Sequence, residues 1–184
     1  MANTASNVTV GKPSVSGAVW VADEGTALPT DATTALNVAF ANVGYISEDG
    51  FSTSISRDNE ELRAWGGDVV LNTQTAYTET ASFTMIESIN LDALKVYFGD
   101  DNVTGTYANG ITVTGNSDEL PYKSYVIDMI TSGGGLHRYV IPSGKVTELE
   151  EITYNDSDPV GLGVTITGRP DSSGNCHYEY IKES

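Results

Sequence analysis

The sequence predicts a mainly β protein, a sandwich or barrel-like fold of antiparallel strands with one flanking helix. Glycine accounts for 19 of the 184 residues, and Val, Ile and Thr recur along the chain. Segments in which apolar and polar residues alternate are separated by clusters of Gly, Asp and Asn, which is typical of short strands joined by turns. A single segment has helical spacing instead. A chain of this length suits one domain with its own core.

The chain begins with small and polar residues that predict an extended or flexible arm at 1–14, followed by a single domain at 15–184. Residues 23–42 contain Gly and Pro and predict a long loop with one or two helical turns. Leu36 and Phe40 are four residues apart in this loop, so they would lie on one side of such a turn.

Short strands are expected around this loop, because apolar and polar residues alternate on either side of it. They fall at residues 14–22, 44–46, 51–56 and 61–65. Glu48-Asp49-Gly50 has the composition of a turn between the second and third of these strands.

The alternation is longest over residues 75–86. Thr78, Thr80, Ser82 and Thr84 would share one face, and Tyr77, Ala81, Phe83 and Met85 the other, which Glu79 interrupts. A strand of about a dozen residues exceeds the usual five or six. We therefore expect it to run past the body of the domain, or through a sheet shared with other subunits.

The single helix is predicted at residues 90–98. Asn90 is a good N-cap, and apolar residues at helical spacing share one face from Leu91 to Phe98. Gly99 supplies the stop. Beyond the helix the chain is strands, which we expect at residues 110–114, 123–131, 136–142, 145–154, 162–168 and 176–181. Gly133-Gly134-Gly135 joins the second and third of these as a hairpin.

The charge balance excludes several classes of partner. Asp and Glu number 25 against 9 Lys and Arg, a formal net charge of -16. Binding to nucleic acid phosphates or to an anionic membrane surface needs clustered cations, so neither is expected. The sequence shows no secretory signal and no apolar run of membrane-spanning length, which predicts synthesis in a cytoplasm.

The sequence predicts no catalytic, cofactor-binding or metal site. His137 and His177 are the two histidines, and neither has metal ligands at the usual spacing. Cys176 precedes His177 in an expected strand, so the two side chains would point to opposite faces. The acidic clusters near residues 48–61 and 148–158 are typical of solvated faces.

Five stretches, taken in chain order, carry a family resemblance. They are VGKPSVSGAVWVA, NVGYISEDGF, RAWGGDVV at 63–70, AYTETASFTMIES at 76–88 and VTITGRPDSSGNCHYEYI at 164–181. In this order they resemble the major tail protein of long-tailed bacteriophages, the subunit of the tail tube. The resemblance extends from about Val8 to about Ile181.

The resemblance implies a β-sandwich with a flanking helix and a structural role in the virion. Six subunits would form a ring whose long hairpins join into an inner barrel, and rings would stack into a hollow tube of a non-contractile tail. The implied partners are other copies, the tape-measure protein, and terminator and tip proteins. DNA would pass through the lumen into the host without specific binding, and no cofactor or membrane is involved.

Candidate assembly residues follow from these patterns. The candidates for subunit interfaces are Trp65, Gly66, Gly67, Asp68, Leu36, Phe40, Glu148 and Glu150, and those for the lumen are Thr78, Thr80, Ser82, Thr84 and Asp128. A Trp beside a tight turn makes a good anchor, although the same residue could close one end of the core. The arm at 1–14, the loop at 23–42 and the acidic segment at 145–158 are candidates for contacts between rings.

Two alternatives remain open from sequence. A monomeric carbohydrate-binding or adhesive β-sandwich would use the Tyr and Trp residues as stacking platforms. A hydrolase would need two carboxylates that converge across a cleft, and it ranks last.

Overall fold

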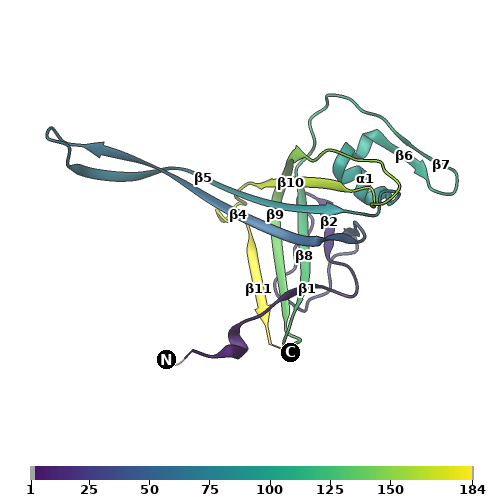
Figure 1. The fold of residues 1–184 in the computed structure, drawn as a ribbon, viewed down its shortest axis with the longest axis horizontal. Coiled ribbons are helices and arrows are strands. Elements are labelled where there is room, and N and C mark those ends of the chain that lie inside the picture. Colours follow the sequence, from purple (N-terminus) through teal and green to yellow (C-terminus); the bar gives the residue numbers. More distant parts are fainter. Residues whose placement is uncertain (1–2, 184) are drawn as a thin grey trace.

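The computed structural model describes residues 3–183 and is built almost entirely from antiparallel strands (Figure 1). The strands are β1 (Gly11–Pro13), β2 (Val19–Asp23), β3 (Ala41–Asn42), β4 (Ile46–Arg63), β5 (Val69–Met85), β6 (Val103–Thr106), β7 (Gly110–Val113), β8 (Lys123–Thr131), β9 (Leu136–Leu149), β10 (Leu162–Gly168) and β11 (Tyr178–Lys182). The helix is α1 (Leu91–Phe98), and two short 3-10 turns lie at Ala5–Asn7 and Asp100–Asn102. The expected mainly β fold is confirmed.

One sheet holds most of the strands, in the order β3-β2-β8-β9-β10-β5-β4. Strand β9 is long enough to have different neighbours along its length. Its first part pairs with β11, from Leu136↔Lys182 to Val140↔Tyr178, and its second part pairs with β10 up to Leu149↔Val164. Strands β6 and β7 form a separate small hairpin.

The main core lies on one face of this bent sheet and beneath α1. It contains Val19, Tyr125 and Ile127 from one side, Phe83, Met85 and Ile166 from the other, and Leu94 and Tyr97 from the helix. The pattern predicted for residues 75–86 is confirmed here, since Ala81, Phe83 and Met85 are buried. A smaller cluster on the opposite face joins Ala22, Phe40, Val126 and Val140.

Helix α1 begins and ends where the sequence predicts. The side chain of Asn90 accepts a hydrogen bond from the backbone N–H of Asp92 at 3.0 Å. Gly99 ends the helix with a φ of 97°, a conformation that favours glycine. The side of α1 that contains Ala93, Leu94, Val96 and Tyr97 is buried.

Strands β4 and β5 form a long hairpin that projects from the body, to the left in Figure 1. They contain 18 and 17 residues and pair from Ile46↔Met85 to Arg63↔Val69. The strand conformation expected at 51–56 is confirmed, and that at 61–65 is confirmed as far as Arg63. The expected division of 44–65 into three short strands is wrong, because the single strand β4 runs through it. The expected turn at Glu48-Asp49-Gly50 is an irregularity within β4, between Ile46 and Phe51.

Two other expectations are corrected. Residues 24–40 contain no helical turn; instead, the Asp31 carboxylate accepts hydrogen bonds from the backbone N–H groups of Thr33 and Thr34, both at 2.6 Å. These bonds favour a turn over a helix. Strand β9 is continuous where two strands, 136–142 and 145–154, were expected.

Candidate assembly surfaces

The outer half of the β4–β5 hairpin is exposed on both faces. We call residues 58–76 the distal hairpin; every one of them is exposed. Large apolar side chains are included, with Leu62 and Leu71 at 60 % and 54 % exposure. A two-stranded hairpin with no core of its own is marginally stable in water. Exposed aliphatic residues on such an element point to an interaction surface.

The hairpin tip is formed by Trp65, Gly66, Gly67 and Asp68. Gly66 and Gly67 have φ values of 118° and 98°, which L side chains rarely adopt. The Asp68 carbonyl accepts a hydrogen bond from the Ala64 N–H at 2.8 Å and closes the turn. The Trp65 side chain is fully exposed. The alternative that Trp65 closes one end of the core is therefore wrong.

Replacing Trp65 with Ala is expected to change the free energy of unfolding by less than about 0.5 kcal/mol, because the side chain contacts no core. A core Trp would cost about 3–5 kcal/mol. Urea unfolding followed by circular dichroism measures this difference. Trp20→Ala is the matched control, since Trp20 packs against the smaller core cluster and its removal should be clearly destabilising.

Serine and threonine side chains cover one face of the four-stranded region formed by β4, β5, β10 and the end of β9. We call this surface the hydroxyl face: Ser52, Ser54, Ser56, Thr78, Thr80, Ser82, Thr84, Thr147, Thr165 and Thr167. Its members bond across strands, as between the hydroxyls of Ser82 and Thr165 (3.0 Å) and of Thr147 and Thr167 (2.8 Å). The core lies on the opposite face.

Glu148 and Glu150 lie at the rim of the hydroxyl face. Glu148 pairs with Thr165 and is exposed. The carboxylate of Glu150 accepts a hydrogen bond from the Thr84 hydroxyl at 3.4 Å and covers Gly163, where a Cβ atom would overlap it. Carboxylates and hydroxyls therefore share this surface.

The other candidates lie elsewhere. The carboxylate of Asp128 binds the Arg138 guanidinium through two bonds of 2.6 and 3.1 Å, beside the loop at 24–40 and away from the hydroxyl face. Phe40 is buried in the smaller cluster of its own chain, and Leu36 packs against that cluster. The structure does not bring these three residues together with the hairpin tip.

The four-stranded region ends in two unpaired edges among the residues that the structure describes. Strand β4 pairs with β5 alone. At the other end, β8 pairs with β9 up to Gly144, so residues 145–149 have β10 as their one neighbour. Unpaired strand edges can pair with another chain. Residues 51–56 of β4, FSTSIS, carry no charge that would oppose such pairing.

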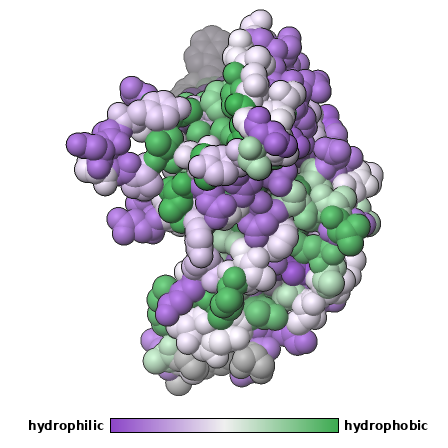
Figure 2. Space-filling view, turned by 90° about the vertical axis from the view of Figure 1, so that its right-hand side faces the viewer, coloured by the Kyte–Doolittle hydropathy of each residue, from purple (hydrophilic) through white to green (hydrophobic). Residues whose placement is uncertain are grey.

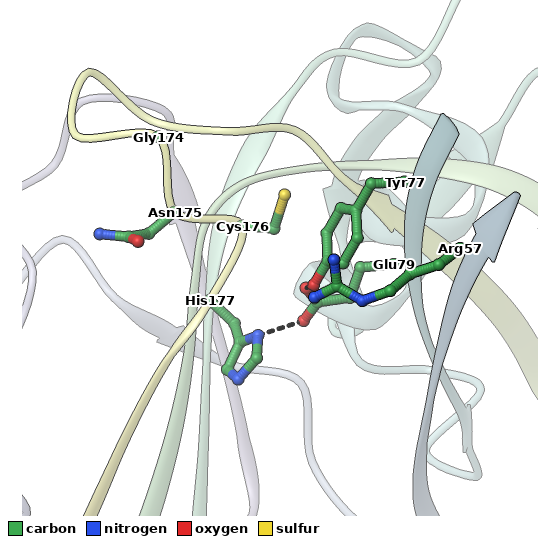
Figure 3. A pocket seen from close by; sticks show the side chains of 7 residues that line it. All are labelled: Arg57, Tyr77, Glu79, Gly174, Asn175, Cys176 and His177. Carbon is green, nitrogen blue, oxygen red and sulfur yellow. Dashed lines mark hydrogen bonds and ion pairs between the residues drawn. The ribbon is translucent and has the colours of Figure 1, made fainter. Parts of the chain in front are cut away.

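A buried polar cluster holds the root of the hairpin (Figure 3). Glu79 on β5 is 4 % exposed. Its carboxylate accepts hydrogen bonds from the hydroxyls of Tyr77 at 2.8 Å and Tyr139 at 2.5 Å. The Nδ1 atom of His177 contacts the same carboxylate, and the His177 ring stacks on Tyr139 with 4.7 Å between centroids. These partners join β5 to β9 and to the segment before β11.

The same region forms an open cavity of about 310 Å³, lined by Arg57, Tyr77, Glu79, Gly174, Asn175, Cys176 and His177. The Cys176 sulfur points away from the His177 ring (Figure 3). Burial raises the pKa of this thiol, which makes it a poor nucleophile at neutral pH. Within residues 3–183, no group of three or more His, Cys, Asp or Glu side chains is placed to hold a metal ion.

Buried tyrosines predict a loss of stability at alkaline pH. Burial raises the pKa of Tyr125, and burial together with the hydrogen bond to Glu79 raises that of Tyr139. A raised pKa means that the folded state holds the proton more tightly. The resulting stability is complete below the ordinary tyrosine pKa near 10 and falls above it, by up to about 1.4 kcal/mol per pH unit for each tyrosine.

Urea unfolding between about pH 9 and pH 12, a range that spans the ordinary tyrosine pKa, measures how the free energy of unfolding changes with pH. Tyr125→Phe removes one phenol from the core and should make the slope shallower. An unchanged slope in that variant would show that Tyr125 does not contribute.

On the side of the molecule opposite the hairpin, hydrophobic residues form separate small groups between hydrophilic ones (Figure 2). Residues 3–183 include no helix that is both long and apolar enough to cross a bilayer. The exposed aromatic residues Tyr45, Tyr107 and Tyr154 lie on different loops, far along the chain from Trp65. No ring contact joins any two of them among residues 3–183.

Comparison with known proteins identifies the family. The family described as phage tail tube protein matches the whole chain, residues 1–184, which confirms the resemblance seen in the sequence. A similar solved structure is the cryo-EM structure of the anti-feeding prophage cap (AFP tube terminating cap), with 12 % identity, a TM-score of 0.49 and full coverage of both chains. No curated protein matches the sequence. The chain therefore belongs to the phage tail tube protein family and is a structural component of a phage tail.

Proposed function

We propose that copies of this protein assemble into rings that stack into the hollow tube of a phage tail. The observation that carries the proposal is the four-stranded region β4-β5-β10-β9, which has an unpaired edge at each end. Joining copies edge to edge closes the sheet into a barrel and satisfies the backbone groups at both edges. The likeness to long-tailed phages makes six copies per ring, in a non-contractile tail, our expectation.

The seam between neighbours pairs β4 residues 51–56 of one copy with β9 residues 145–149 of the next. Residues 51–56 are exposed or half-buried in the single chain, and so are residues 145–149 apart from Val146, which faces the core. Glu148 lies at this seam, while Leu36 and Phe40 act within their own subunit. The proposed ring therefore uses the sheet edges and not the loop at 24–40.

The hydroxyl face lines the lumen in this arrangement, with Thr78, Thr80, Ser82 and Thr84 toward the water-filled channel. Hydroxyls and the carboxylates of Glu148 and Glu150 offer no cation to DNA phosphates. Lys145, which pairs with Thr167 on this face, is bound to the carboxylate of Glu119. The net charge of -16 adds repulsion. DNA then passes into the host without specific binding, after the tape-measure protein has left the same channel. Terminator and tip proteins close the two ends, and no catalysis is part of this role.

Negative-stain electron microscopy of the purified chain, over a range of concentration and salt, tests the proposal. We expect hollow tubes or six-fold rings, either spontaneously or after preformed tube ends are added. A chain that stays monomeric in both conditions and is retained on a glycan column would contradict it and support the carbohydrate-binding alternative.

A further inference from the structure

Two lysines lie at the ends of one row of residues that crosses four strands. Lys12 on β1 pairs with Ile130 on β8, Ile130 pairs with Leu136 on β9, and Leu136 pairs with Lys182 on β11. Directly paired residues project from the same face of a sheet. We call these four residues the basic row. Both lysines are exposed, and the two aliphatic side chains between them are half-buried.

Free cations are scarce in this acidic chain, which makes the row distinctive. Five of the nine basic residues form ion pairs: Arg63, Lys123, Arg138, Lys145 and Arg169. Arg57 lies over the Tyr77 ring at 4.6 Å. Among the described residues, Lys12, Lys95 and Lys182 make no ion pair. Two of these three lie on the basic row.

The distal hairpin carries the complementary pattern. Asp58, Glu60 and Leu62 alternate along β4 and therefore share one face. Leu62 pairs directly with Leu71 on β5, so two exposed aliphatic side chains lie beside two carboxylates. Neither the Asp58 nor the Glu60 carboxylate has a bonding partner among residues 3–183. We call these four residues the acidic face.

We infer that the acidic face of one copy docks on the basic row of a second copy. Leu62 and Leu71 cover Ile130 and Leu136. Asp58 and Glu60 follow one another on the same side of Leu62 along β4, so both carboxylates lie toward one end of the basic row. The contact cannot form within one chain, because the hairpin points away from the lobe that carries both termini (Figure 1). Opposite charges steer the encounter, and the apolar centre supplies most of the affinity.

The contact joins two different surfaces, so each copy can donate its hairpin to one neighbour and receive the hairpin of another, and the contact can repeat along an axis. Edge pairing between β4 and β9 closes a ring; docking of the distal hairpin stacks one ring on the next. The inference rests on the proposed tube, and it assigns the axial contact to particular residues.

Disulfide trapping between two single-cysteine chains tests the contact directly. Both chains carry Cys176→Ala; one adds Leu62→Cys and the other Ile130→Cys. After mixing under oxidising conditions, we expect the disulfide-linked heterodimer in about tenfold higher yield than for Tyr107→Cys mixed with Ile130→Cys, because docking raises the local concentration. Equal yields would overturn the inference. The measurement is informative even if no tube forms.

Charge reversal supplies the second measurement. Lys12→Glu with Lys182→Glu should raise the concentration needed for tube assembly about tenfold or more, while Lys95→Glu, the matched control, should leave it unchanged. Adding Asp58→Lys and Glu60→Lys to the chain that carries both lysine reversals should restore assembly. Tubes that form normally without trapped heterodimer would leave the proposed function standing and the axial contact wrong. Trapped heterodimer without tubes or rings would support the contact between the two surfaces and contradict the proposed function.

Discussion

Replacing residues 58–76 with the two-residue turn Asn-Gly is expected to abolish tube formation while leaving the body folded. Every residue removed is exposed, so the deletion takes no side chain from the core. Arg57 and Tyr77 pair across the two strands and would flank the new turn. Asn-Gly suits the type I′ turn that joins hairpin strands. The melting temperature should therefore stay within about 2–4 °C of the full chain, a shift equivalent to roughly 1 kcal/mol for a domain of this size.

Tube formation should fail because the deletion removes exposed apolar residues of the distal hairpin. Leu62 and Leu71 are among them, and the proposed axial contact needs both. Thermal melting by circular dichroism measures the fold, and electron microscopy with sedimentation measures assembly. A full-length variant with Leu62→Thr and Leu71→Thr loses the apolar surface but keeps the length of the hairpin. It therefore separates these two effects of the deletion. Tubes of ordinary length from the shortened chain would show that the distal hairpin has no axial role. Single rings from it would agree with edge pairing through the retained part of β4.

Local patterns predicted the parts of the fold that depend on local chemistry. Helix α1 follows from the Asn90 cap, its apolar spacing and Gly99. Strand β8 and the hairpin turn at residues 132–135 follow from alternation and glycine. The core-facing side of β5 follows from Ala81, Phe83 and Met85. In the helix and the strands one face is buried, so apolar residues recur at a regular spacing that can be recognised in the sequence.

The long hairpin could not be predicted in the same way. Its outer half is exposed on both faces, so no burial pattern marks residues 57–60 as a strand or joins the segments at 51–56 and 61–65 into one strand. Glu48-Asp49-Gly50 has turn composition, yet the chain continues through it as an irregular strand. Gly66 and Gly67 were singled out in the sequence; their position at the tip is clear only once the two flanking strands are paired. The surface to which we assign assembly is therefore the one that local patterns describe least.

The polar cluster around Glu79 was also beyond local reasoning. The sequence shows this residue as an interruption of an apolar face. Its partners Tyr139 and His177 lie 60 and 98 residues away in the chain, so no spacing rule relates them. Both histidines contact glutamates, since His137 lies 2.8 Å from the carboxylate of Glu179. No spacing in the sequence relates either histidine to its glutamate.

Replacing Glu79 with Ala is expected to lower the free energy of unfolding by about 3 kcal/mol, because it leaves buried polar partners without an acceptor. The hydroxyls of Tyr77 and Tyr139 and the Nδ1 atom of His177 all contact this one carboxylate. Glu79→Gln keeps the shape and one acceptor oxygen, so its cost should be nearer about 1 kcal/mol. Urea unfolding of the three chains measures both values.

The position of Glu79 adds a second consequence. It pairs with Ile55, at the point where the hairpin leaves the body, and its partners belong to β9 and to the segment before β11. Losing the carboxylate should therefore loosen the direction of the hairpin as well as the fold. We expect Glu79→Ala to assemble poorly even at temperatures where it is fully folded, with faster hydrogen exchange at residues 53–57. If Glu79→Ala assembles like the unchanged chain, or if Glu79→Gln costs as much stability as Glu79→Ala, the carboxylate is not what orients the hairpin.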